Sequence, residues 1–303
     1  MRIFITGASG HIASAVIPEL ISAGHTVVGL ARSDRATAAI QALGADVHRG
    51  DLADVAVLAA AAREADGVIH LAFDHEQQGR GNLQAAVAAD LEAIHAIGQA
   101  LAGSGKPFVG TCATGGIAIA GFSGLLTETV TLPGGPRIEA ENTVIALAQQ
   151  EVRSSVVRLP PAVHHDGRYG FVSGLIDIAR ATGKAGYLGD GSNRWPSTDT
   201  RDVAIAYRLA LESAGAGTRV HAVAEEGIPM RQIAEAIGRR LGVPTAPVAP
   251  EDAPRQFGFL SAFVGLDNPT SSRITRATLG WKPTRPGLIS AIEADVALTP
   301  DAN

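Results

Sequence analysis

A glycine-rich turn directly follows the first apolar segment of the chain. Residues 2–6 have the isoleucine and phenylalanine content of a buried strand, the turn reads Thr6-Gly7-Ala8-Ser9-Gly10-His11-Ile12-Ala13, and residues 11–23 continue with a helical pattern. Only glycine lets a strand turn this tightly into a helix while the backbone approaches a pyrophosphate, which the helix N-terminus attracts. The turn therefore predicts a dinucleotide site formed by Gly7, Ser9, Gly10, His11 and Ile12.

Short apolar segments alternate with longer helical ones over the first 160 residues. Strands are expected at residues 2–6, 25–32, 45–49, 67–72, 106–111 and 153–159, and helices at 11–23, 35–43, 55–64, 82–102 and 137–150. Strands separated by helices of this length form right-handed βαβ units. The fold class predicted is α/β, with a Rossmann-type doubly wound parallel sheet.

The alternation breaks after Pro160 and Pro161. Helices are expected at residues 202–212 and 229–241, the latter with Ile233, Ala234 and Ile237 facing inward, and a strand at 219–223 is placed to return to the main sheet. We therefore predict a Rossmann domain made of residues 1–160 plus about 201–224. A smaller, discontinuous substrate-binding lobe would comprise about 161–200 and 225–303.

Composition and charge exclude several classes of partner. The formal net charge of −5 gives no basic surface for nucleic acid or for an anionic membrane. The uncharged stretch 107–127 contains five glycines, so it is expected to form a strand plus a loop and not a membrane helix. Cys112 is the single cysteine, which is typical of a cytoplasmic protein, and the adjacent histidines of His164-His165-Asp166 do not predict a metal site. The expected partner is a small-molecule substrate.

The end of the second predicted strand bears on the choice of cofactor. An NAD-selective site places Asp or Glu there to accept from the ribose 2′-hydroxyl, whereas this chain has Arg32 and Ser33. These side chains suit a 2′-phosphate, so NADP is favoured over NAD. The alternative is that the arginine is simply solvated at the end of a strand.

Several motifs together resemble a known family. They are the TGASGHIA turn, Gly50-Asp51-Leu52, Val68-Ile69-His70-Leu71-Ala72 and Val157-Arg158-Leu159-Pro160-Pro161. The chain resembles, over essentially its whole length, the extended short-chain dehydrogenase/reductase (SDR) superfamily, in its NAD(P)-dependent epimerase/dehydratase branch. The resemblance implies that Asp51 and Leu52 hold the adenine, that Leu71, Ala72 and Phe73 line the adenosine ribose and the phosphates, and that Pro160 to Val163 lie along the nicotinamide. It also implies a possible homodimer.

The usual catalytic pair of this family is missing. The family carries a Tyr and a Lys four residues apart on the helix after the fifth strand, yet between Thr111 and Arg153 there is neither. In one register Pro133 replaces the Tyr and Arg137 the Lys, which we prefer because Glu141 then has the family's spacing to Arg158. In the other register Arg137 replaces the Tyr and Glu141 the Lys. Arg137 is expected either to contact a phosphate, ribose or acidic substrate, or to face water.

Two other residues are candidates for the chemistry. Thr114, next to Ala113 at the family's serine position, is suited to donate a hydrogen bond to a carbonyl oxygen, and His75 follows the fourth strand as a candidate proton donor. The alternatives are a loop cap and a solvated loop histidine. Asp90, where the family carries Asn, is expected to brace its helix, and Trp195 to lock the C-terminal lobe or wall the substrate pocket.

The leading functional hypothesis is an NADP-dependent oxidoreductase of the atypical extended SDR type that acts on a small carbonyl or alcohol. The alternative is an NADP-binding redox sensor or regulatory protein, as in the NmrA-like branch, without turnover. A sugar epimerase or dehydratase is less favoured because the Tyr that starts the transient oxidation is missing.

Overall fold

The computed structural model describes residues 1–75, 77, 80–135 and 137–298. Its main sheet has seven parallel strands in the order β10-β6-β5-β4-β1-β2-β3. They are β1 (Arg2–Thr6), β2 (Thr26–Ala31), β3 (Asp46–Arg49), β4 (Gly67–His70), β5 (Pro107–Ala113), β6 (Arg153–Leu159) and β10 (Thr218–His221). The strand order reverses between β1 and β4, which is where doubly wound sheets bind ligands at the carboxyl ends of the strands. The predicted fold class is confirmed.

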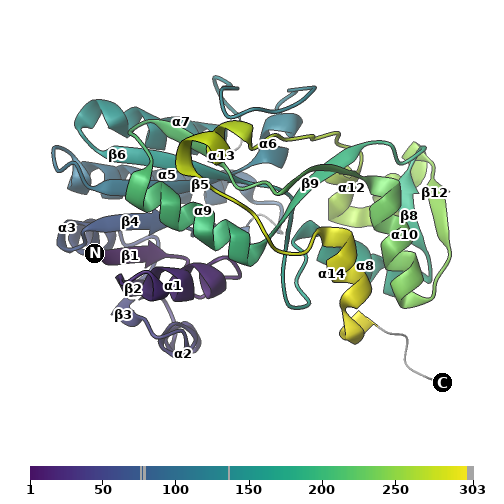
Figure 1. Ribbon diagram of the computed structural model, residues 1–303, viewed down its shortest axis with the longest axis horizontal. Coiled ribbons are helices and arrows are strands. Elements are labelled where there is room, and N and C mark those ends of the chain that lie inside the picture. The colour runs from purple at the N-terminus through teal and green to yellow at the C-terminus, as the bar shows by residue number, and fades with distance from the viewer. Residues whose placement is uncertain (76, 78–79, 136, 299–303) are drawn as a thin grey trace.

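Helices cover both faces of this sheet (Figure 1). In chain order they are α1 (Ala13–Ser22), α2 (Asp34–Ala42), α3 (Val55–Glu64), α5 (Leu83–Leu101), α7 (Ile138–Ala146) and α9 (Thr200–Ser213). Alternate side chains of β1 supply both cores, because Ile3 and Ile5 pack with α1 and α9 while Phe4 packs with α3 and α5. The central strands are therefore buried on both sides, as a parallel sheet requires.

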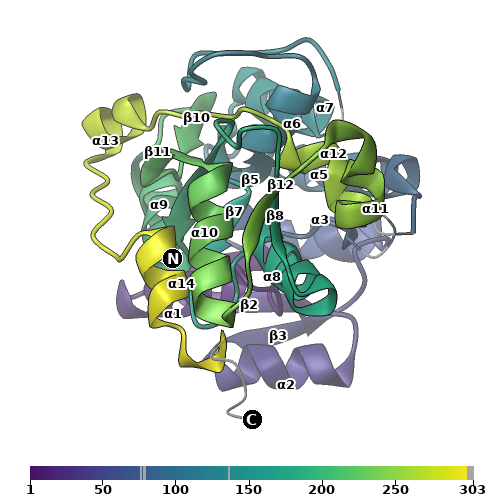
Figure 2. The same cartoon turned by 90° about the vertical axis from the view of Figure 1, so that its right-hand side faces the viewer.

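The C-terminal part of the chain surrounds a core of its own beside the sheet (Figure 2). It contains a three-stranded sheet in the order β11-β9-β7 and a strand pair, β12 with β8. The strands are β7 (Ala162–His164), β8 (Ala185–Leu188), β9 (Arg194–Asp199), β11 (Glu225–Pro229) and β12 (Thr245–Val248). The helices are α8 (Phe171–Thr182), α10 (Met230–Leu241), α11 (Ala253–Phe257), α12 (Ser261–Val264), α13 (Arg273–Leu279) and α14 (Leu288–Ala294). As predicted, Ile233, Ala234 and Ile237 of α10 are buried.

Three local expectations need correction. The loop expected after β5 begins with a short helix, α6 (Thr114–Ile119). The helix expected from residue 11 starts at Ala13, because the glycine turn occupies the preceding residues. The helix expected at 137–150 is α7, which begins after Arg137 and continues past Ala146 only as a 3-10 turn, Leu147–Gln150.

Within the described ranges, no helix is both long and apolar enough to cross a membrane.

Candidate active site

The glycine turn packs directly against the backbone that follows β4. Gly7 has a φ of +67°, and a Cβ on it would lie 2.7 Å from the Ala72 nitrogen, so no other residue fits this position without strain. The Gly10 N–H donates to the Gly7 carbonyl at 3.0 Å, which closes the turn. Ser9 and Gly10 are exposed, and α1 begins without a side-chain cap from Ile12. An uncapped helix N-terminus beside exposed backbone fits a diphosphate group.

His11 connects this turn to α9. Its Nε2 lies 3.1 Å from Thr200 Oγ1 at the first turn of α9. Burial, reinforced by the charge of Arg168, lowers the pKa of His11. The His11 ring is therefore neutral, and it joins the glycine turn to the N-terminus of α9. Its contact with a cofactor stays a prediction.

The residues predicted for the adenosine end follow β2 and β3 at the same edge of the sheet. Arg32 and Ser33 are exposed, and Ser33 Oγ accepts from the Ala36 N–H at 3.2 Å as the N-cap of α2. Asp51 is exposed and accepts from the Ala53 N–H at 3.0 Å, whereas Leu52 packs against the core under α3. The structure brings these four residues to one rim, and their contacts with a cofactor stay a prediction.

A chain of buried polar side chains runs below the ends of β1, β4 and β5. Thr6 Oγ1 lies 2.7 Å from His70 Nδ1, and His70 Nε2 lies 2.9 Å from Asp90 Oδ1 on α5. Burial acts to raise the pKa of Asp90, but the hydrogen bond from His70 and the charge of Arg137 outweigh it and the pKa is lowered. Asp90 is thus an ionised group that ties α5 to the sheet, and not only a brace within its own helix.

Arg137 completes this chain. Its Nη1 lies 3.7 Å from Asp90 Oδ2, its Nη2 donates to the Thr111 carbonyl at 2.7 Å, and its guanidinium carbon lies 4.1 Å from the centre of the Phe73 ring. The side chain is only 16% exposed, so the interpretation of Arg137 as a water-facing residue is wrong. A planar guanidinium meets these three neighbours at once, which a lysine ammonium cannot do.

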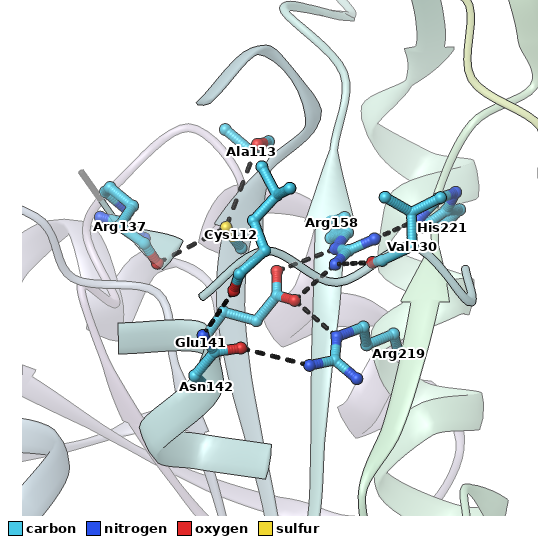
Figure 3. A network of polar contacts seen from close by, with 10 residues as sticks. Cys112, Ala113, Val130, Arg137, Glu141, Asn142, Arg158, Arg219 and His221 are labelled. Carbon is cyan, nitrogen blue, oxygen red and sulfur yellow. Dashed lines mark hydrogen bonds and ion pairs between the residues drawn. The ribbon is translucent and has the colours of Figure 1, made fainter. Parts of the chain in front are cut away.

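The ion pair of Glu141 favours the first of the two registers. Figure 3 shows Glu141 on α7 between two arginines: Arg158 Nη2 lies 2.5 Å from its Oε1, and Arg219 Nε 2.6 Å from the same oxygen. Both the Glu141 and Arg158 side chains are buried. In that register Arg137, four residues before Glu141, stands in place of the lysine, and this assignment stays a prediction. Pro133, at the tyrosine position, is exposed and brings no acid.

The two candidate catalytic residues follow neighbouring strands. Thr114 is fully buried at the start of α6, and its Oγ1 accepts from Asn268 Nδ2 at 2.8 Å. His75 is exposed after β4, with its ring centre 5.1 Å from that of Phe73. Asn268 was not anticipated, because nothing near it in the sequence marks it as a partner of Thr114.

A tyrosine does lie below this edge of the sheet, but it does not replace the missing one. The Tyr207 hydroxyl on α9 is 2.7 Å from Thr111 Oγ1, which itself donates to the His70 carbonyl at 2.7 Å. Tyr207 therefore donates to Thr111. Its side chain is fully buried, and burial raises its pKa. The hydroxyl thus serves packing and does not supply an acid for a substrate.

A small recess that is partly open to solvent lies beside the Thr114–Asn268 pair. It is lined by Gly115, Pro161, Phe171, Trp195, Phe263, Leu266 and Asn268. Pro161 belongs to the segment predicted to lie along the nicotinamide, in which Pro160 and Val163 are buried. Trp195 forms part of the wall of this recess, and its role at a substrate pocket stays a prediction.

The parallel sheet and the glycine turn at its switch point define a Rossmann-type dinucleotide-binding fold. A model of the NAD dependent epimerase/dehydratase family matches residues 3–107. The chain is 43% identical over 295 residues to an uncharacterized protein of Schizosaccharomyces pombe, covering 97% of this chain and 99% of that protein. It is 28% identical over 269 residues to 2-alkyl-3-oxoalkanoate reductase of Stenotrophomonas maltophilia, covering 80% and 77% of the two chains.

Solved structures show the same fold. The UDP-glucose 4-epimerase of Thermotoga maritima, solved with UDP-glucose, aligns with a TM-score of 0.77 at 19% identity over 98% of each chain. MoeE5 in complex with UDP-glucose and NAD gives 0.76 at 19% identity, also over 98% of each chain. The chain belongs to the NAD dependent epimerase/dehydratase family and has the extended SDR fold.

Proposed function

We propose that this protein is an NADP-dependent oxidoreductase of the atypical extended SDR type, which transfers a hydride between the nicotinamide and a small carbonyl or alcohol. The observation that carries the proposal is the Thr114–Asn268 hydrogen bond at the wall of the recess. Because Asn268 donates to Thr114 Oγ1, the Thr114 hydroxyl proton remains for another acceptor. A carbonyl oxygen that enters the recess next to Asn268 is such an acceptor.

The bound nicotinamide supplies or takes up the hydride, and the proton must come from the protein or from water. His75 is suited to this task because it is exposed in the segment after β4, beside β5, which leads into Thr114, and can exchange its proton with solvent. Arg137 and Asp90 act as positioning residues, since they hold the Phe73 segment against the ends of β4 and β5.

Two further observations support the choice of cofactor and of reaction. Arg32 places a cation at the end of β2, where an NAD-selective site has a carboxylate. The relative from Stenotrophomonas maltophilia is by its name a reductase of an oxoalkanoate. The alternative, an NADP-binding redox sensor, is favoured by one observation, the absence of the Tyr–Lys pair.

Turnover and binding together test the proposal. NADPH should raise the melting temperature of the protein, and a panel of small aldehydes and ketones should include at least one that consumes NADPH. Thr114→Val should then lower kcat about 10-fold or more, while Thr114→Ser, which keeps the hydroxyl, should retain most of it.

Two results would count against an oxidoreductase. A melting shift by NADPH with no carbonyl reduced would favour the sensor, and the absence of any shift would remove both hypotheses. His75→Gln tests the proton donor separately, because it should lower the rate of carbonyl reduction about 10-fold or more if His75 supplies the proton, and leave NADPH binding unchanged.

A further inference from the structure

The recess beside Asn268 is apolar on nearly all sides. Among its lining residues only Asn268 and the indole N–H of Trp195 bring polar side-chain groups, and none is charged. Asn268 is itself only 4% exposed and holds Thr114. Hydrogen-bonding groups are thus few in the recess, and the Asn268 corner lies at the end of β5.

Aromatic rings from separate segments make up the opposite wall. The rings of Phe171, at the start of α8, and Phe263 on α12 have centres 4.9 Å apart at 66°. Trp195 on β9 meets Phe171 edge-on at 6.4 Å, and Phe259 meets Phe263 at 5.2 Å. Edge-to-face packing of this kind fixes the rings against one another. Phe259 is 54% exposed, so the aromatic cluster reaches the surface.

We propose that this recess binds the apolar substituent, an alkyl chain or a single ring, of the carbonyl substrate. The inference rests on the proposed function and adds the class of substrate to it. Each buried methylene gains about 0.8 kcal/mol against such a wall, whereas sugar hydroxyls or phosphates placed there would lose their water without finding partners. The recess is small and partly open to solvent, so the substituent would lie along the aromatic wall and not be enclosed by it.

The two ends of the recess also orient the substrate. The carbonyl oxygen belongs at the Asn268 corner, where the Asn268 amide and, behind it, the buried Thr114 hydroxyl are the donors. The substituent then extends toward Phe171 and Phe263. Reduction in this orientation adds a hydride to the carbonyl carbon and a proton to the oxygen, which gives a secondary or primary alcohol.

Binding can be followed without turnover through Trp195. The chain has two tryptophans, and Trp281 lies elsewhere, with its Nε1 donating to the Asp202 carbonyl. In NADP⁺-bound Trp281→Phe protein, we expect 2-hexanone to change the Trp195 fluorescence at a concentration at least about 10-fold lower than 5-oxohexanoate, in which a carboxylate replaces the terminal methyl of the same six-carbon skeleton. Shortening the ketone by one methylene should weaken binding about 3- to 4-fold. UDP-glucose should cause no change.

Variants at the wall sharpen the test. Phe263→Ala should weaken 2-hexanone about 10-fold or more, while Phe122→Ala, in a separate apolar cluster beside α6, should leave its binding within about 2-fold. Phe263→Lys should reverse the preference toward 5-oxohexanoate. If Trp281→Phe does not fold, the difference between wild-type and Trp195→Phe titrations gives the same signal.

The outcomes separate this inference from the proposed function. If ketones bind with the expected order of affinities but none consumes NADPH, the inference about the recess stands and the proposed oxidoreductase activity is contradicted. Reduction of ketones irrespective of chain length and charge, or displacement of 2-hexanone by UDP-glucose, would overturn the inference about the recess and leave the oxidoreductase standing.

Discussion

Arg137 Nη1 lies 3.7 Å from Asp90 Oδ2, and this contact joins the N-terminus of α7 to the middle of α5 below the edge of the sheet. Asp90 is 1% exposed and also accepts from His70, whereas Arg137 reaches the Thr111 carbonyl and the Phe73 ring as well. One cation and one anion therefore hold together the ends of β4 and β5.

Arg137→Met should lower the free energy of unfolding by about 2 kcal/mol, because it leaves the buried Asp90 carboxylate with His70 alone. It should also weaken NADPH about 10-fold, since the Phe73 segment loses the guanidinium that it stacks on. Urea unfolding and a NADPH titration measure the two effects.

Arg137→Lys is the matched control for charge. It keeps the cation but cannot reach Asp90 and the Thr111 carbonyl together, so an intermediate loss of stability is expected. In the Asp90→Asn protein, Arg137→Met should lower the free energy of unfolding by at least about 1 kcal/mol less than it does in the wild type. Additive losses would show that the two side chains do not interact.

The sequence alone predicts the sheet well and the C-terminal part poorly. The strands β1 to β6 and their helices follow one another closely along the chain, and each of them is marked by its own apolar residues. The strands β7, β8 and β9 are three to six residues long and β9 contains Pro196, so no periodic pattern marks them. The proposed domain boundaries stay a prediction.

The candidate site shows the same division. The role of Gly7 and Gly10 can be predicted from the sequence because it depends only on the residues of one turn. Asn268 and Thr114 are 154 positions apart, and only the folded chain brings them together. Arg137 is a non-glycine residue with a φ of +64°, and neither this backbone conformation nor its contact with Asp90 has a signal in the neighbouring residues.

Arg32→Ala should raise the Kd of NADPH about 10- to 100-fold and that of NADH less than 3-fold, because a charge-assisted hydrogen bond to a 2′-phosphate is worth roughly 1.5 to 3 kcal/mol. Arg63→Ala, on α3 and likewise exposed, is the control. Titrations followed by nicotinamide fluorescence compare the cofactors. An equal loss for both would contradict the assignment of NADP to Arg32.

Gly7→Ala should abolish the thermal shift by NADPH. It should also lower the free energy of unfolding by more than the cost of the positive φ alone. Its φ is positive and its new Cβ would lie 2.7 Å from the Ala72 nitrogen, so the turn must move away from β4. Gly24→Ala has a comparable φ of +83° with nothing within 4 Å, and should cost only about 1 to 2 kcal/mol and keep the NADPH shift. Identical behaviour of both variants would show that the close approach is unimportant.

Lowering the pH from 7.5 to 5 should destabilise the protein through His221. Burial lowers the pKa of His221 from 6.5 to about 4. The ring nitrogen Nδ1 donates to the Ser271 carbonyl at 2.7 Å. The other nitrogen, Nε2, lies 3.2 Å from Arg158 Nη1 (Figure 3), so it must accept a hydrogen bond and stay unprotonated. Between pH 6.5 and 4 the unfolded chain binds the extra proton, so stability is lost as the pH falls through this window.

The expected loss from His221 down to pH 5 is about 2 kcal/mol. The carboxylates with lowered pKa contribute mainly below the ordinary values of 3.8 for Asp and 4.5 for Glu, so this range isolates the histidines. These carboxylates are Asp90, Glu141, Asp190, Asp199 and Asp267. His221→Gln keeps one donor for Ser271 and one acceptor for Arg158. The free energy of unfolding of this variant should fall less steeply with decreasing pH than that of the wild type. The fall that remains comes from groups such as buried His164, whose pKa is also lowered by burial. Urea unfolding at each pH gives both slopes, and equal slopes would exclude His221 as the titrating group.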